Sequence, residues 1–489
     1  MFLFTDVMLS LSYQKRPDSK TPVLAPIFAD DVDAQRRKIF RGLSRAQKRA
    51  VRTVISKHPV AKSGVVPVYS GDAVVLLLIL DKNAKVTTRE AREAGEKVFG
   101  IANSHKITSL LVAPGSLEKD RFAAFQEGVA LGAYEFTEYK GKKSAEETEA
   151  PKLSNVQFIA EGSKPDLEHV QTVAEGVRLA KDIINTPPSD ANPEYLNRMA
   201  DELAKSVKGV TIKTLLQKDC EKLGMGGIIG VGRGSKYDSR LIILEYYGGK
   251  KDEAPLVLAG KGVTFDTGGN NIKTGPHMRW MKQDLGGAAT MLGAFYTAAK
   301  SGVPKNLICV VPAVENMVSR DAYFPDDILR MYNGVTVEVH TTDAEGGLIL
   351  ADAMAYAEEQ YKPRAIIDAA TLTGACAYAV GNDFVAGLTT NQRLFNSLKR
   401  VAETVDEPLW QLPLHQRYAE KLKSSTADIV NCSSGLKPGT IEGGLFLQNF
   451  VTEQTPWVHL DIASVTFDDN AGLATGRTVR TLARFAETY

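Results

Sequence analysis

The sequence reads VVLLLIL at residues 74–80, TTREAREAGEKVF at residues 87–99 and ITSLLV at residues 107–112. The first run is apolar throughout, which is typical of a strand buried on both faces. The second has the pattern of an amphipathic helix behind a threonine cap, and the third is again strand-like. A strand, a helix and a strand in this order predict a βαβ unit and an α/β fold with a largely parallel sheet.

The same alternation continues after a polar, charge-mixed stretch, EYKGKKSAEETEAPK, at residues 138–152. Such a stretch is typical of a domain boundary. We therefore predict two α/β domains: a smaller N-terminal βα domain at residues 1–150 and, after a linker and connecting helix at 151–185, a larger domain at 186–489. In the larger domain we expect a mostly parallel or mixed sheet flanked by helices. Its expected strands are 240–246, 255–259, 307–312, 335–339 and 365–368, and its expected helices include 286–299 and 348–360.

Composition excludes several classes of protein. The chain has 489 residues with 59 Lys and Arg against 58 Asp and Glu, and this balance argues against nucleic acid as a partner. No apolar run approaches the 18 or so residues of a membrane span. The first twenty residues lack a basic start, so we read a first strand there and not a signal peptide. Four cysteines without a CxxC pair suit a reducing compartment, which predicts a cytoplasmic protein.

Two segments concentrate ionisable residues where predicted strands end. The first is LAGKGVTFDTGGNNIK at residues 258–273, which runs on to MKQDLGG at residues 281–287. The second is HTTDAEGGL at residues 340–348, directly after the strand predicted at 335–339. Ligands of open α/β sheets bind at the carboxyl ends of strands, so both segments are candidates for a site.

The carboxylates of these segments point to metal ions. Asp343 and Glu345 are two residues apart, and extended backbone would place both side chains on one side. Together with Asp266 and Asp284 they would repel one another unless a cation neutralised them. Each aspartate alone is more typical of a turn or a helix cap. Jointly, oxygen ligands in excess of one ion's needs predict two divalent ions with bridging carboxylates. The chain contains no HExxH motif and only seven scattered histidines, so these ligands would be mainly oxygens.

The motifs GKGVTFDTGGNNIK, MKQDLGGAAT and TTDAEGGLILADA resemble the leucyl aminopeptidase (cytosol aminopeptidase) family of dinuclear metallopeptidases. NTPPSDANPEYL, AATLTGA, WVHLDIA and ATGRTVRTL follow in the family's order, so the resemblance covers about residues 166–489. It implies an aminopeptidase in which a metal-bridged water attacks the scissile carbonyl. It also implies which residues bind the two ions: Lys261, Asp266, Asp284, Asp343 and Glu345.

The resemblance assigns further roles. Lys273 is the implied catalytic lysine, which stabilises the oxyanion. The implied substrate-binding residues are Met281, Thr371, Leu372, Gly374 and Ala463. A small apolar pocket of this kind would weakly prefer Leu-like N-terminal residues of peptide substrates. The ions would be Zn²⁺ or Mn²⁺, with Mg²⁺ or Co²⁺ as alternatives, and the family's assembly is a homohexamer.

One departure from the family pattern, N-T-D-A-E-G-R, matters. Gly347 stands where the family has an arginine that holds a bicarbonate acting as general base. Arg279 or Lys282 could supply an anion site instead. Two alternatives therefore remain open. The first is a catalytically impaired family member with a binding or regulatory role, and the second is a different dinuclear hydrolase such as a phosphatase.

Overall fold

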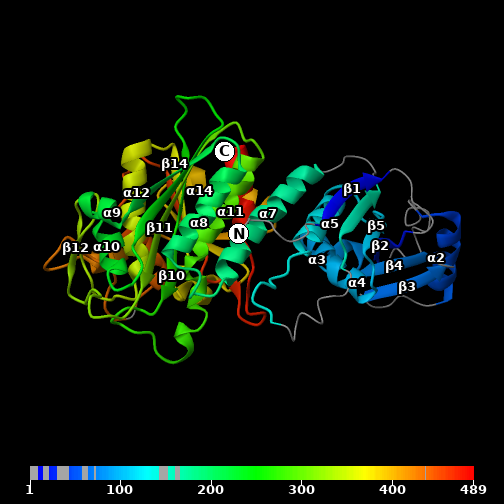
Figure 1. The fold of residues 1–489 in the computed structure, drawn as a ribbon, viewed down its shortest axis with the longest axis horizontal. Helices are drawn as coiled ribbons and strands as arrows, with labels where there is room; N and C mark the ends of the chain where they lie inside the picture. Colours follow the sequence, from blue (N-terminus) through cyan, green and yellow to red (C-terminus); the bar gives the residue numbers. More distant parts are fainter. Residues whose placement is uncertain are drawn as a thin grey trace. The chain divides into compact units, whose positions relative to one another are not determined.

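The computed structural model describes residues 9–14, 21–29, 43–57, 64–70, 73–141, 152–159, 166–435 and 437–489. The chain forms two compact units, Met1–Ala174 and Glu175–Tyr489 (Figure 1). Most of the polar stretch predicted as the domain boundary, residues 142–151, lies outside the described residues. Among the described residues, none of the helices combines the length and the apolar character that a membrane crossing needs.

The N-terminal unit is built on a six-stranded sheet with the order β1-β6-β5-β2-β4-β3. All neighbouring pairs are parallel except β3 with β4. The strand expected near the start of the chain is β1, which pairs with β6. The strands are β1 (Ser10–Gln14), β2 (Val23–Phe28), β3 (Gly64–Ser70), β4 (Ala73–Leu80), β5 (Ser109–Val112) and β6 (Asn155–Ile159). The helices are α2 (Arg45–Lys57), α3 (Thr88–Glu96), α4 (Val98–Ser104) and α5 (Lys119–Leu131), with η1 (Asn83–Lys85) before α3.

The predicted helix at 87–99 is two helices. Thr87 caps α3 as expected, since its side chain accepts the N–H of Glu90 in a capping box. The helix then ends at Glu96, and α4 begins at Val98. α3 packs so closely on α5 that a Cβ at Gly95 would lie 2.2 Å from the carbonyl oxygen of Phe125. Only glycine fits this crossing.

The C-terminal unit has a nine-stranded mixed sheet with the order β16-β15-β18-β14-β9-β11-β8-β7, in which β10 also pairs with β11. The central strands β18, β14, β9 and β11 are parallel, and antiparallel pairs stand toward the edges. The sheet lies between α10 and α12 on one side and α8 and α11 on the other (Figure 1). The predicted α/β class, with a mixed sheet flanked by helices, is confirmed.

The expected elements of this unit are present with small shifts of their ends. Its strands are β7 (Val210–Leu216), β8 (Arg240–Tyr247), β9 (Leu256–Gly260), β10 (Gly262–Asp266), β11 (Asn306–Asn316), β12 (Ile328–Arg330), β13 (Thr336–Glu338), β14 (Ala365–Ala370), β15 (Val385–Thr389), β16 (Leu409–Gln411), β17 (Ile429–Val430), β18 (Trp457–Asp461), β19 (Phe467–Asp468) and β20 (Leu473–Ala474). Its α-helices are α7 (Leu167–Asn185, which begins in the first unit), α8 (Pro193–Ser206), α9 (Gln217–Lys222), α10 (Gly226–Gly232), α11 (Gly286–Lys300), α12 (Glu345–Tyr361), α13 (Ala375–Val380), α14 (Gln392–Thr404), α15 (Gln416–Ala419), α16 (Gly439–Gln448) and α17 (Val479–Thr488). The 3₁₀ helices are η2 (Gly275–Met278), η3 (Met281–Leu285) and η4 (Glu420–Leu422).

The carboxyl ends of the central strands gather the candidate residues. Lys261 follows β9, Asp266 ends β10, Thr371 follows β14 and Ala463 lies two residues beyond β18. Because these strands run in parallel, their carboxyl ends share one edge of the sheet. This is the edge where α/β sheets bind their ligands.

Candidate metal centre

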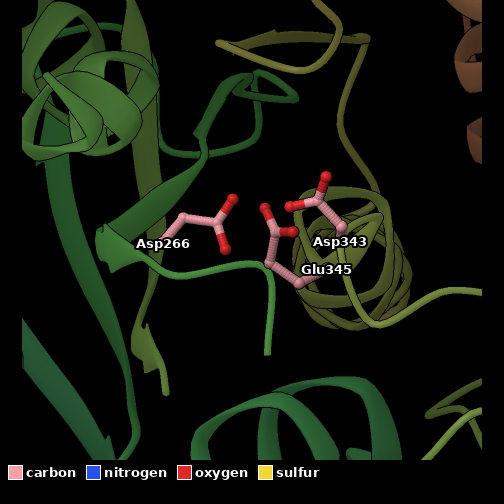
Figure 2. Close-up of side chains that lie close together, drawn as sticks. All are labelled: Asp266, Asp343 and Glu345. Atoms are coloured by element: carbon pink, nitrogen blue, oxygen red, sulfur yellow. The ribbon is translucent and has the colours of Figure 1, made fainter. Parts of the chain in front are cut away.

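Three carboxylates converge at this edge of the sheet. One oxygen from each of Asp266, Asp343 and Glu345 lies within 4.8 Å of the others, and Figure 2 shows the three side chains facing one another. Asp266 comes from a strand end, and Glu345 from the first turn of α12. The sequence-based expectation of extended backbone at 343–345 is wrong, because Asp343 lies in a turn and Glu345 begins the helix. The turn still brings the two carboxylates together.

Two lysines link the carboxylates, and one of them, Lys261, ties the fourth carboxylate, Asp284, to this group. Lys261 Nζ lies 2.7 Å from Asp284 Oδ1 and 2.9 Å from Glu345 Oε1. It also donates to the carbonyl oxygen of Thr371 at 2.9 Å. Lys273 Nζ lies 2.8 Å from Asp266 Oδ2 and 2.6 Å from Asp343 Oδ1. All six residues expected to bind metal or to act in catalysis therefore form one cluster.

Four of the six side chains are buried, which makes their charges costly, whereas Lys273 is half-buried and Asp343 is exposed. Burial raises the pKa of Asp284 above its usual value, although Lys261 opposes the rise. Burial, reinforced by Glu345, also raises the pKa of Asp266. Burial alone would lower the pKa of Lys261, but Asp284 and Glu345 outweigh it and raise that pKa. Burial and an excess of negative charge, four carboxylates against two ammonium groups, together account for these shifts.

Two buried carboxylate oxygens of the cluster take no part in its ion pairs. Within the described part of the chain, Asp284 Oδ2 and Glu345 Oε2 have no hydrogen-bond partner. A buried carboxylate oxygen without a donor is costly, and it can accept a cation. Carboxylate oxygens, with the nitrogen of Lys261 once an incoming ion has displaced a proton from its ammonium group, are a donor set that suits Zn²⁺ and Mn²⁺. The residues present therefore fit divalent ions.

The residues expected to bind substrate lie on segments beside this cluster. Thr371 Oγ1 donates to Asp284 Oδ1 at 2.9 Å. The backbone N–H groups of Leu372 and Ala463 both donate to Asp461 Oδ1, at 3.3 and 3.2 Å. Met281 begins the 3₁₀ turn that carries Asp284, and Gly374 precedes α13.

Gly347, where the sequence departs from the family pattern, lies against a side chain of another helix. A Cβ at Gly347 would lie 3.0 Å from Cδ1 and 3.1 Å from Cε1 of Phe446 in α16. The aromatic ring therefore occupies the volume into which a longer side chain at this position would extend.

The sequence patterns did not identify the residues that hydrogen-bond to the loops carrying the candidate metal ligands. Asn316 donates to Asp266 Oδ1 at 2.8 Å, and Tyr323 Oη donates to the carbonyl oxygen of Thr342 at 2.8 Å. Asp461 joins the two pocket segments. Asn316 and Asp461 each end a buried strand of the central sheet. A polar residue at the end of such a strand is the sequence feature that could have identified them. His459, two residues before Asp461 on the same strand, has its Nδ1 2.6 Å from Asp368 Oδ1.

Comparison with known proteins decides the family. The model of the cytosol aminopeptidase family's catalytic domain matches residues 178–483, and the model of its N-terminal domain matches residues 61–143. The chain belongs to the cytosol aminopeptidase family. Membership makes it a hydrolase, and specifically a metal-dependent aminopeptidase that acts on peptides. The recognition made from the sequence motifs is confirmed.

Individual relatives agree with this assignment. The chain is 40% identical to a probable cytosol aminopeptidase of Cenarchaeum symbiosum over 84% of its own length and 85% of the relative's. It is 39% identical to a cytosol aminopeptidase of Pseudomonas aeruginosa over 84% of each chain. Among solved structures, a mutant of tomato leucine aminopeptidase superposes with a TM-score of 0.87 at 27% identity, covering 99% of this chain and 98% of that one. The bottromycin maturation enzyme BotP in complex with Mn superposes with a TM-score of 0.81 at 28% identity, covering 96% and 99%.

Proposed function

We propose that the chain removes N-terminal residues, Leu-like ones preferentially, from peptides with the help of two divalent ions held by Lys261, Asp266, Asp284, Asp343 and Glu345. The observation that carries the proposal is the largely buried cluster of four carboxylates and two lysines, in which two buried carboxylate oxygens have no hydrogen-bond partner among the described residues. When bound, such ions polarise a carbonyl and activate a water at neutral pH.

Lys273 is the chain's own electrophile. Burial would lower its pKa, but Asp266 and Glu345 raise it, so the ammonium stays protonated at neutral pH. Its side chain is 15% exposed against 3% for Lys261, so a substrate can reach it more easily. We assign it to donate an N–H to the oxyanion that develops as the peptide bond is attacked. Loss of one such donor lowers kcat by about 10²–10³.

The preference for Leu-like residues rests on the pocket segments. Met281, Leu372 and Ala463 offer apolar side chains near Thr371, whose hydroxyl is engaged by Asp284. Met281 and Leu372 are half-buried, so an apolar side chain of the substrate can gain contact there. One methylene is worth about 1–3 kcal/mol in such a pocket, so discrimination between Leu and Met is expected to be weak.

The test is hydrolysis of leucyl p-nitroanilide by metal-stripped protein before and after addition of Mn²⁺ or Zn²⁺. The proposal expects metal-restored release of nitroaniline, with N-acetyl-leucyl p-nitroanilide resistant because its amine is blocked. Hydrolysis of p-nitrophenyl phosphate alone would favour the phosphatase reading. Binding of two ions without turnover on any leucyl substrate would favour the impaired member, in which Gly347 has removed the proton shuttle.

Two further properties belong to the same proposal. The family's bicarbonate has no arginine partner at Gly347, where the Phe446 ring lies instead, so we do not assign bicarbonate to this chain. We propose a cytoplasmic homohexamer, in keeping with the relatives' name and with the family resemblance of the motifs. Sedimentation at several protein concentrations measures the assembly, and a mass well below six chains contradicts it.

A further inference from the structure

Asn316 links the two segments that carry the carboxylates. It is the last residue of β11, and its side chain is fully buried. Its Nδ2 donates to Oδ1 of Asp266 at 2.8 Å and to the carbonyl oxygen of Thr342 at 3.0 Å. A carboxylate and a carbonyl can only accept, so the nitrogen of the amide must face them.

The two oxygens of the Asp266 carboxylate have different hydrogen-bonding partners. Oδ1 accepts the N–H of Gly268 at 2.8 Å as well as that of Asn316. Oδ2 instead pairs with Lys273 Nζ at 2.8 Å. Two N–H donors thus restrain the orientation of the carboxylate through Oδ1 and leave Oδ2 to Lys273.

The second contact reaches the other loop. Thr342 directly precedes Asp343, and its carbonyl oxygen accepts both from Asn316 and from the Tyr323 hydroxyl at 2.8 Å. One amide nitrogen therefore couples the end of β10 to the turn before α12. Together with Lys273, which bridges the two carboxylates, this amide sets the separation between Asp266 and Asp343.

The other end of the amide argues against a purely structural role. Asn316 Oδ1 is buried and has no hydrogen-bond partner among the described residues. A buried unpartnered oxygen disfavours folding, and leucine has nearly the same shape without that penalty. The amide is thus better explained by the two bonds of its nitrogen than by packing.

We propose that Asn316 is a positioning residue for divalent-ion binding, holding Asp266 and the Thr342–Asp343 turn at the spacing that two ions require. The proposal rests on the metal centre proposed above. Residues that orient a metal ligand typically contribute about 10–100-fold to metal affinity. We expect a loss of this size when the amide is removed.

The chain offers a matched control at Asn431. Its Oδ1 accepts the N–H of His340 at 2.9 Å, and its Nδ2 donates to the carbonyl oxygen of Thr341 at 2.7 Å. It anchors the same loop as Asn316 through backbone atoms, without bonding to Asp266. Asn431→Leu therefore tests loop anchoring alone, whereas Asn316→Leu removes anchoring and carboxylate orientation together.

The experiment titrates metal-stripped full-length wild type, Asn316→Leu, Asn316→Ala and Asn431→Leu with Mn²⁺ by calorimetry and with Co²⁺ by visible absorption. We expect about 10–100-fold weaker Mn²⁺ binding and an altered Co²⁺ spectrum in both Asn316 variants, with Asn431→Leu within a few-fold of wild type. Thermal melting without metal shows whether each variant folds.

Four results overturn the proposal. Wild-type affinity in a folded Asn316 variant removes the positioning role and leaves the metal centre intact, as does an equal loss in Asn431→Leu. Failure of both Asn316 variants to fold assigns the residue to folding instead. If wild type itself binds no Mn²⁺, the metal centre falls and this proposal falls with it.

Discussion

Adding one methyl group at Gly346 should disable the centre without unfolding the protein. Gly346 is the second residue of α12, next to Glu345. A Cβ there would lie 2.6 Å from Cε, 2.7 Å from Cδ and 2.8 Å from Nζ of Lys261. Ordinary carbon contacts begin near 3.4 Å, so the lysine end must retreat by about 0.8 Å, the difference between 3.4 and 2.6 Å.

Lys261 has nowhere to retreat without losing partners. Its side chain is 3% exposed, and its bonds to Asp284, Glu345 and the Thr371 carbonyl oxygen are 2.7–2.9 Å long. A shift of about 0.8 Å breaks at least one of them. Misplacement by about 1 Å can lower the rate about 10²-fold, so we expect Gly346→Ala to lose about 10²-fold in kcat/KM, which is about 2.7 kcal/mol.

Stability should move much less than activity. Alanine favours a helix over glycine by about 1 kcal/mol, and this gain offsets part of the strain. The matched control is Gly347→Ala, whose Cβ meets only the Phe446 ring, at 3.0–3.1 Å, and needs a displacement of a few tenths of an ångström.

The assay is leucyl p-nitroanilide hydrolysis at saturating Mn²⁺ for both variants, with thermal melting in parallel. Full turnover in Gly346→Ala, or an equal loss in Gly347→Ala, would refute the reasoning that Lys261 must stay where it is.

Three other perturbations have expected outcomes. The backbone N–H groups of Ile228 and Tyr332 donate to Asp352 at 2.9 and 2.8 Å, and Asp352→Ala leaves both without their acceptor. The free energy of unfolding in urea should therefore fall by about 3 kcal/mol, and a fall of less than about 1 kcal/mol contradicts this. Burial alone would lower the pKa of His459, but Asp368 raises it, so its stabilisation is complete below about pH 6.5 and is lost as pH rises through the higher folded pKa. The difference in unfolding free energy between wild type and His459→Gln should therefore shrink over that rise, and a constant difference argues against it. Chelation of the ions should lower the melting temperature at fixed protein concentration, since ligands of the folded state stabilise it, and an unchanged temperature contradicts tight binding.

The elements that could be predicted from sequence are those with a strong local pattern. The apolar run at 74–80 is β4, and the apolar stretch after Asp284 is α11, because burial on both faces leaves an unmistakable composition. The break at Lys97 could not be predicted, since it accompanies a close crossing of α3 and α5 that joins residues far apart in the chain.

In the candidate site too, residues within local motifs could be predicted, and residues whose role depends on distant contacts could not. The proposed metal ligands stand in glycine-rich motifs at strand ends, so sequence pattern and family resemblance together identified all five of them as candidates. Asn316 carries no motif, and its role depends on its register beside Asp266 in the sheet. The backbone at Asp343 was misjudged because the start of α12 lies inside the motif, and spacing alone does not distinguish a strand from a turn before a helix.

The central claim is that these carboxylates bind two ions and that the ions are required for turnover. The most direct test titrates metal-stripped wild type and Asp343→Ala with Mn²⁺ and measures bound Mn²⁺ and leucyl p-nitroanilide hydrolysis in the same samples. The account predicts two ions per chain in wild type, with hydrolysis rising as they bind, and loss of both in Asp343→Ala. Full hydrolysis in Asp343→Ala, or in metal-free wild type, would contradict it.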